Sequence, residues 1–166
     1  MEKIIKAKPH RLLKNFYVGC VRVSFTLCIE PRVNFFRNEN IKVINEFLEI
    51  LKEECGRQNV INWIYIFMPD HLHMILEGTT DESDLSRVLK MFKQRTGYFL
   101  NKNFGSAVKW QKSYYDYIHR EKDKLKWQMK YIAENPVRKD IVKQWHEYEH
   151  TGSIHKDVGQ MISSLD

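Results

Sequence analysis

Two histidines separated by a single residue are the pattern in this sequence that points most directly to chemistry. They are His71 and His73, in the segment Met68-Pro-Asp-His-Leu-His-Met-Ile-Leu. Alternate residues of a strand project from the same face, so both imidazoles can converge on one ion. Two neutral imidazoles suit Mn, Zn, Fe, Cu or Ni, and Mg also fits where a substrate phosphate and waters complete an octahedron. The alternative is a pair of exposed surface histidines, because short spacings also arise by chance.

A tyrosine and an asparagine one helical turn apart offer two further groups. Tyr131 precedes Asn135 by four residues, which places both side chains on nearly the same face of a helix. A phenol can act as a nucleophile when a base or a metal assists it, and an amide oxygen can serve as a third metal ligand. The alternatives are that Tyr131 packs within the helix layer and that Asn135-Pro136 is a helix junction capped by the asparagine.

Positive charge is concentrated in one part of the chain. The 166 residues contain 27 Lys and Arg against 21 Asp and Glu, a net charge of +6 that favours a polyanionic partner. No acidic residue lies between Leu85 and Tyr115, where seven cations alternate with aromatic rings, as in proteins that bind single-stranded nucleic acid. The alternative is that the rings are core residues and the lysines only solubilise a helix. The candidate nucleic-acid-binding residues, in this stretch and after it, are Arg87, Lys90, Lys93, Arg95, Lys109, Trp110, Lys112, Arg120 and Arg138.

Composition indicates one globular domain. Hydrophobic residues make up 43% and aromatic residues 13% of the chain, which excludes an intrinsically disordered protein, and the length excludes a multidomain enzyme. We expect a single domain over residues 1–166, with a core of about 17–145 and a C-terminal extension of 146–166. The three cysteines have no CxxC spacing, and no signal-peptide or membrane-spanning run is present, so we expect a cytoplasmic protein with reduced thiols and no membrane partner.

Alternating hydrophobic periods predict the elements that position these residues. A strand pattern of period two covers 21–29, and a helical pattern follows it. In the segment after Pro69-Asp70, Leu72 and Met74 point into a core while His71 and His73 point to the other face. The predicted strands are 21–29, 60–68, 71–77 and 114–120, and the predicted helices are 41–51, 81–100 and 122–135.

The order of these elements, βαββαβα, predicts an α+β fold. Two crossovers around a hairpin give a ferredoxin-like βαββαβ sandwich, a four-stranded antiparallel sheet with helices on one face. The other face of the sheet is then free for a ligand.

Three motifs occur together in an order and spacing that resemble a known family. They are Met68-Pro-Asp-His-Leu-His-Met-Ile-Leu-Glu77, Trp110-Gln-Lys-Ser-Tyr-Tyr-Asp-Tyr-Ile-His-Arg120 and Tyr131-Ile-Ala-Glu-Asn-Pro-Val-Arg138. Over residues 17–145 the chain resembles the REP-associated tyrosine transposases, relatives of the single-tyrosine, His-hydrophobic-His transposases of small bacterial insertion sequences. The chain departs from the family pattern where Tyr117 replaces a frequent histidine and His119 replaces a common aliphatic residue.

This resemblance implies a function and a set of roles. It implies a ferredoxin-like fold with a C-terminal helix that carries the tyrosine, and an endonuclease that cuts and rejoins single-stranded DNA next to hairpins. Tyr131 is then the catalytic nucleophile that forms a 5′-phosphotyrosine, and His71, His73 and Asn135 bind a divalent metal, Mg or Mn. The implied partner is single-stranded or hairpin DNA.

Two questions stay open at the level of sequence. The chain could form a homodimer in which Tyr131 of one copy serves the histidines of the other. It could also be a non-catalytic nucleic-acid-binding protein on the same fold. A small metal-dependent hydrolase is less consistent, because it would need more carboxylates near His71 than Asp70 and Glu77 provide.

Overall fold

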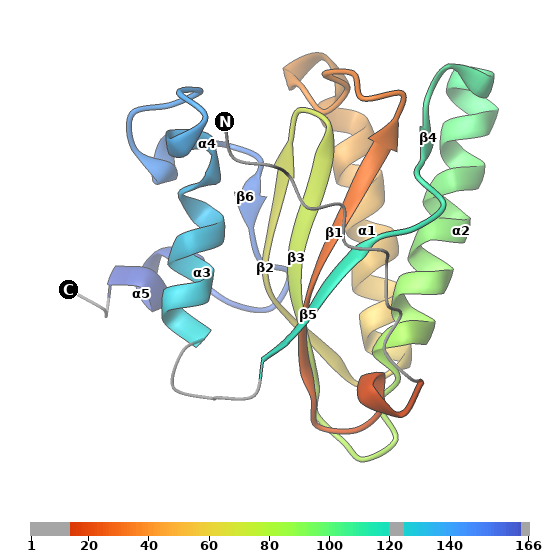
Figure 1. Ribbon diagram of the computed structural model, residues 1–166, viewed down its shortest axis with the longest axis vertical. Coiled ribbons are helices and arrows are strands. Elements are labelled where there is room, and N and C mark those ends of the chain that lie inside the picture. The colour runs from red at the N-terminus through yellow and green to blue at the C-terminus, as the bar shows by residue number, and fades with distance from the viewer. Residues whose placement is uncertain (1–13, 120–124, 164–166) are drawn as a thin grey trace, which may run out of the picture.

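A central antiparallel sheet organises the protein (Figure 1). The computed structural model describes residues 14–119 and 125–163. β1 pairs with β3, which lies at the centre, β3 pairs with β2, and β2 pairs with β6 at one edge. On its other side β1 pairs with β5 at its start and with β4 at its end. The strands are β1 (Arg22–Glu30), β2 (Val60–Met68), β3 (His71–Gly78), β4 (Lys109–Trp110), β5 (Tyr115–His119) and β6 (Thr151–Gly152).

Helices lie on both sides of this sheet. In Figure 1, α1 and α2 lie behind it and to the right, and α3, α4 and α5 lie to the left. The side chain of Asp84 accepts a hydrogen bond from the backbone N–H of Arg87 and so caps the start of α2. The helices are α1 (Ile41–Arg57), α2 (Leu85–Phe104), α3 (Leu125–Ala133), α4 (Asn135–Arg138) and α5 (Val158–Ser163).

The predicted ferredoxin-like order is confirmed, with two differences at the edges of the sheet. The predicted fourth strand, 114–120, is β5, and an additional two-residue strand, β4, pairs with the other end of β1. The second difference is β6, a two-residue strand from the C-terminal part of the chain that lengthens the sheet beyond β2.

The larger core lies between the sheet and the helices α1 and α2. Alternate residues of β1, from Val23 to Ile29, face this core and are at most 1% exposed. Leu72 and Met74 of β3 are fully buried there, as their alternation with the histidines predicts. The residues between them on each strand therefore point to the opposite face of the sheet.

That opposite face is only partly free, which corrects the sequence-based expectation. Its β2 side is covered by α3, α5 and the chain around Tyr148, which form a second apolar core. The reason is visible in β2, whose side chains are apolar on both faces and require a cover on each. The residues of this second core are Ile64, Ile66, Met68, Ile75, Leu125, Met129, Ile132, Ala133, Tyr148, Val158 and Ile162.

The C-terminal segment is an integral part of this packing. The hydroxyl of Tyr148 donates to the carbonyl oxygen of Phe67 at 2.7 Å, and the backbone N–H of Phe67 donates to the carbonyl of His150. Residues 148–163, which we expected to form an extension, thus hold α3 against the sheet. Among the described residues, no helix combines the length and apolar character needed to span a membrane.

Candidate active site

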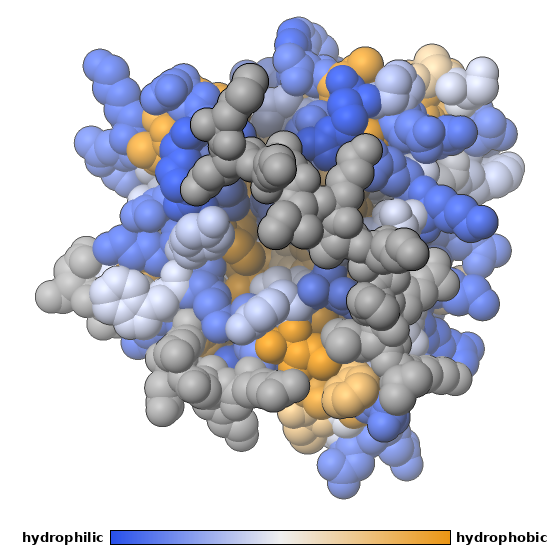
Figure 2. Space-filling model, in the orientation of Figure 1, coloured by the Kyte–Doolittle hydropathy of each residue, from blue (hydrophilic) through white to orange (hydrophobic). Residues whose placement is uncertain are grey.

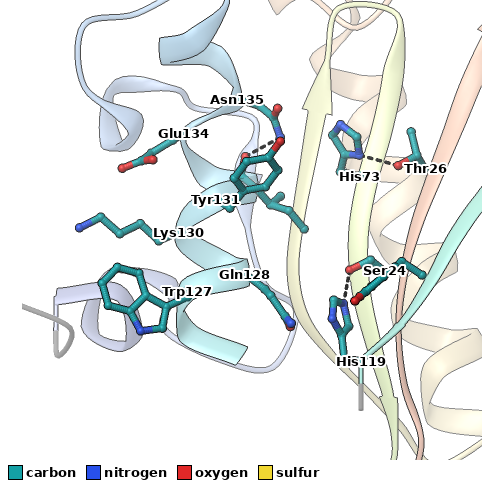
Figure 3. A pocket seen from close by; sticks show the side chains of 12 residues that line it. Ser24, Thr26, His73, His119, Trp127, Gln128, Lys130, Tyr131, Glu134 and Asn135 are labelled. Atoms are coloured by element: carbon teal, nitrogen blue, oxygen red, sulfur yellow. Dashed lines mark hydrogen bonds between the residues drawn. The ribbon is translucent and has the colours of Figure 1, made fainter. Parts of the chain in front are cut away.

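An open cavity of about 800 Å³ lies between α3 and the uncovered part of the sheet. Figure 3 shows side chains from the strands on one side of it and from α3 and α4 on the other. His73 and Thr26 lie at one end with Tyr131 and Asn135, and His119 and Ser24 lie at the other end. The lining residues are Ser24, Thr26, His73, Tyr117, His119, Trp127, Gln128, Lys130, Tyr131, Ile132, Glu134 and Asn135.

The two predicted histidines lie side by side with their Nε2 atoms 3.0 Å apart. Each ring is fixed through its other nitrogen. Nδ1 of His71 lies 2.5 Å from a carboxylate oxygen of Asp70, and Nδ1 of His73 lies 2.7 Å from the hydroxyl of Thr26. The second oxygen of Asp70 accepts a hydrogen bond from Arg32 at 2.7 Å. The strand geometry and these outer partners together direct both Nε2 atoms toward one point.

Burial favours the neutral form of both imidazoles. It lowers the pKa of His73 to about 3, and repulsion from a protonated His71 and from Arg138 acts in the same direction. Burial also lowers the pKa of His71, although the neighbouring Asp70 opposes the change. Burial alone would raise the pKa of Asp70, but the hydrogen bond and charge of His71, with Arg32, leave it below its ordinary value. An ionised Asp70 requires the proton of His71 to be on Nδ1, which leaves the Nε2 lone pair available.

The positions of the two Nε2 atoms and the partners of the two Nδ1 atoms fit a metal ion bound by both histidines. Two nitrogen ligands about 2.1 Å from a metal and at a right angle to each other are roughly 3 Å apart, which is the observed Nε2 separation. A metal-bound imidazole usually donates its other ring N–H to a carboxylate, carbonyl or water, which fixes the orientation of the ring. Among the described residues, no group of three His, Cys, Asp or Glu side chains could hold a metal. Within the described part of the chain, a third protein ligand would therefore be of another type.

Asn135 lines the same cavity as His73 and carries an amide oxygen. Pro136 has no N–H, so it cannot donate to the carbonyl of Ile132 as a continuous helix would require. The side-chain amide of Asn135 donates to this carbonyl instead, at 3.0 Å. Its Oδ1 accepts a hydrogen bond from the guanidinium of Arg138 at 3.0 Å. The helix junction uses the amide nitrogen of Asn135, so its amide oxygen is left as an acceptor of a positively charged group.

Tyr131 lies in the same cavity and is accessible. Its side chain is 65% exposed, so it does not pack in the apolar interior. The guanidinium of Arg138 lies over its ring, with the central carbon 4.0 Å from the ring centroid, and donates to the backbone carbonyl of Tyr131. The structure thus brings together the predicted residues His71, His73, Tyr131, Asn135 and Arg138.

Most of the other predicted nucleic-acid-binding residues lie elsewhere. Arg87, Lys90 and Arg95 are on α2, which covers the opposite face of the sheet from the cavity. Arg95 is paired with Glu53 at 2.7 Å and with Glu54 at 2.8 Å, so it holds α1 and α2 together.

The remaining members of that set are also accounted for. Lys93 donates to the carbonyls of Gln111 and Lys112, whereas the side chains of Lys109 and Lys112 are exposed. Arg120 lies outside the described residues.

Trp110 is a correction to the sequence-based set. It is 7% exposed and packs in the larger core, where its indole N–H donates to the hydroxyl of Thr96 at 2.8 Å. A buried ring cannot stack on a base, so Trp110 is a core residue. The alternative interpretation, that rings in the basic run belong to the core, holds for this residue.

Sequence reasoning missed several residues of the cavity. Ser24 and Thr26 alternate with the core residues of β1, and Trp127 precedes Tyr131 by four residues on α3. Ser24 and Thr26 have the two-residue spacing of the histidine pair, and Trp127 has the four-residue spacing that relates Asn135 to Tyr131. The same periodicity could therefore have identified these residues. Gln128 and His119 complete the end of the cavity away from His73 (Figure 3).

Comparison with known proteins agrees with this architecture. A solved structure of a REP-associated tyrosine transposase bound to a REP hairpin is similar with a TM-score of 0.73. The two chains are 17% identical, and the similarity covers 94% of this chain and 88% of the other. A proposed transposase from Deinococcus radiodurans R1 gives a TM-score of 0.49 at 18% identity, over 76% of this chain and 95% of that one. A search of curated proteins found no match.

A family model supplies the assignment that these distant structural similarities do not. The model described as "Transposase IS200 like" matches residues 18–135, which is well over half of the chain and includes β1, the histidine pair, Tyr131 and Asn135. This chain therefore belongs to the IS200-like transposase family.

Proposed function

We propose that this protein is a tyrosine transposase that cuts and rejoins single-stranded DNA beside hairpins through a covalent bond to Tyr131. The observation that carries this proposal is that Tyr131, His73 and Asn135 line one cavity within a single chain. The similar structure that contains a REP hairpin supports DNA of this kind as the partner. His71, His73 and Asn135 would hold the divalent metal, Mg or Mn, which when bound neutralises charge on the phosphoryl oxygens.

The reaction begins with the phenol of Tyr131. Its oxygen attacks the scissile phosphorus in line, forming a bond to the 5′ phosphate as the bond to the 3′ oxygen breaks. The phenol loses a proton to solvent, and the departing 3′ oxygen gains one. A 3′-hydroxyl of another strand can then attack the phosphotyrosine and regenerate the phenol. The exchange needs no external energy source, because one phosphodiester linkage replaces another.

Arg138 and the backbone around it restrain the nucleophile. The guanidinium stacks on the Tyr131 ring and also bonds to Asn135, so it fixes the phenol relative to the amide oxygen. The positive charge beside the phenol favours a nearby phosphate. These contacts align the attacking group before substrate arrives, which reduces the entropy that the reaction must overcome.

The arrangement favours catalysis within one copy of the chain. α3 packs on β2 of its own sheet through Met129 and Ile132 and is held there by α5. Tyr131 therefore faces the histidines of the same chain. We expect a mixture of the Tyr131→Phe and His73→Ala variants to remain inactive. Recovery of activity on mixing would show that the tyrosine and the histidines come from different copies.

The direct test is incubation with single-stranded hairpin DNA and Mn²⁺ or Mg²⁺, followed by denaturing electrophoresis. A hairpin library with randomised single-stranded flanks avoids the choice of one sequence. We expect a slowly migrating protein-DNA band that is absent with Tyr131→Phe and with chelator. DNA binding without an adduct or cleavage from the whole library would instead indicate a non-catalytic nucleic-acid-binding protein.

A further inference from the structure

The end of the cavity away from the histidine pair contains a second set of polar groups. Ser24 and His119 lie on neighbouring strands, with the hydroxyl oxygen 2.5 Å from Nε2 of the imidazole. Gln128 extends from α3 toward them (Figure 3). Neither His119 nor Gln128 belongs to the metal or tyrosine groups described above.

Two polar atoms in this set have no hydrogen-bond partner within residues 14–119 and 125–163. Nδ1 of His119 and Oε1 of Gln128 are buried, and no described residue forms a hydrogen bond with either atom. A buried polar atom without a partner costs free energy, so such atoms are uncommon unless a ligand or water satisfies them. Both atoms belong to residues that line the same cavity, so a ligand bound there lies next to both side chains.

Two aromatic side chains border the same space and remain accessible. Tyr117 is 66% and Trp127 is 60% exposed, and both line the cavity. The ring of Tyr117 packs against His119 with centroids 5.1 Å apart, so the polar edge and the flat surface adjoin each other. Exposed rings beside unsatisfied donors and acceptors suit a flat heterocycle with a hydrogen-bonding edge.

The set lies in the same cavity as the proposed nucleophile. Tyr131 lies beside Asn135 at one end, and Gln128 extends toward His119 at the other (Figure 3). A strand with its scissile phosphate at Tyr131 that continues along the cavity would bring a flanking base to Gln128.

We propose that Ser24, His119, Gln128 and the rings of Tyr117 and Trp127 form a subsite for one unpaired nucleobase that adjoins the scissile phosphate. This inference rests on the proposed function, because it assigns the sequence preference of the same site. Oε1 of Gln128 accepts from an amino or imino group of the base. Nδ1 of His119 meets a neighbouring edge atom, while Ser24 holds the ring through Nε2.

The chemistry of the subsite favours a base over a phosphate. Burial lowers the pKa of His119 to about 4, and the charge of Arg22 adds to this, so the ring is neutral at physiological pH. A neutral imidazole and a carboxamide oxygen offer hydrogen bonds without a net charge. The carboxamide oxygen only accepts hydrogen bonds and so cannot pair with a phosphate oxygen, whereas a base edge also offers donors.

The test compares base preferences of the full-length protein and its variants on hairpin DNA with randomised single-stranded flanks. Bound DNA and covalently attached DNA are recovered separately and sequenced. For the wild type we expect roughly tenfold preference for one base at one flanking position, the size of a good base contact. Gln128→Ala should abolish that preference and leave preferences at other positions unchanged. Gln94→Ala, the same substitution at an exposed site of α2, is the matched control and should retain the wild-type profile.

A second variant separates stacking from edge contacts. Trp127→Ala should weaken retention of all bases at that position about tenfold, because stacking is tolerant of sequence. The subsite is contradicted if Gln128→Ala keeps the wild-type base profile, or if it weakens all positions equally. If bound DNA shows the preference and Gln128→Ala removes it, but no covalent adduct forms, the subsite stands and the proposed transposase chemistry fails. If covalent adducts form and the wild type and Gln128→Ala have the same base profile, the transposase chemistry stands and the subsite is contradicted.

Discussion

The ring of Tyr131 lies beneath the guanidinium of Arg138, with the central guanidinium carbon 4.0 Å from the ring centroid. The same guanidinium donates to Oδ1 of Asn135. One side chain therefore contacts both the proposed nucleophile and the proposed third metal ligand. The sequence motif that contains the tyrosine extends from Tyr131 through Arg138. These contacts explain why an arginine seven residues after the tyrosine belongs to the motif.

Removal of this arginine is expected to slow adduct formation with little effect on folding. Arg138→Ala loses a charged donor beside the reacting phosphate, and the loss of one such donor slows catalysis by roughly a hundredfold. Arg138→Lys should recover part of the rate, because it keeps the charge without the planar fork. Single-turnover adduct formation is the measurement, and Lys143→Ala, an exposed site nearby, is the control. A wild-type rate in Arg138→Ala would exclude this role.

Metal affinity is expected to depend on the partner of His71 as well as on the ligands. Asp70→Ala removes the carboxylate that holds Nδ1 of His71, and losses of such second-shell partners weaken binding by roughly 10- to 100-fold. His73→Ala should weaken it further. Calorimetric titration with Mn²⁺ measures both, with Asp140→Ala as a control at an exposed carboxylate. Equal affinity in wild type and His73→Ala would place the metal elsewhere.

The C-terminal segment is expected to stabilise the whole protein. Ile162 is 3% exposed in the second core, and large-to-small substitutions at such sites cost about 2–5 kcal/mol. Ile162→Ala should lower the free energy of unfolding by an amount in this range, measured by urea denaturation. Ser163→Ala, the next and exposed residue of α5, should change it by less than about 0.5 kcal/mol. Similar stability of Ile162→Ala and the wild type would mean that the segment does not pack in solution.

Stability is expected to fall in mild acid partly because of His119. In the unfolded chain its ring accepts a proton near the ordinary pKa of 6.5, whereas in the folded chain the pKa is about 4. Between these values the unfolded state binds more protons, so the free energy of unfolding decreases as pH falls through this window. His119→Gln should show a shallower decrease than the wild type in urea denaturation. The exposed His146→Gln should follow the wild type, and a parallel decrease in His119→Gln would contradict this assignment.

Elements with a strong period were predictable from the sequence, and those without one were not. In β1 core residues alternate with polar ones, and in β3 they alternate with His71 and His73. This alternation predicted both strands and the face of the sheet on which the two histidines lie. β4 and β6 contain two residues each, too few for any period to be recognised. Their positions depend on pairing with β1 and β2, which is a tertiary effect.

Aromatic and charged residues of similar sequence context have different environments. Trp110 is buried against Thr96 while Trp127 is 60% exposed in the cavity. Arg95 lies in a run without acidic residues, yet its partners are Glu53 and Glu54, about forty positions earlier on α1. Composition along the chain cannot reveal such contacts, because they form only when α1 and α2 pack side by side.

The surface around the candidate site combines polar and apolar areas. Figure 2 shows hydrophilic side chains over much of this face, with apolar side chains gathered in places between them. A mixed surface of this kind suits a partner that presents both phosphates and unpaired bases.

The most direct measurement of the central claim is the identity of the residue that becomes linked to DNA. Hairpin DNA with randomised flanks is incubated with the wild-type protein and Mn²⁺, the adduct is digested with protease and nuclease, and tandem mass spectrometry locates the residual phosphonucleotide. Our account predicts that it is attached to the phenol oxygen of Tyr131. Attachment to Tyr117, the other exposed tyrosine of the cavity, or the absence of any adduct under these conditions, would contradict it.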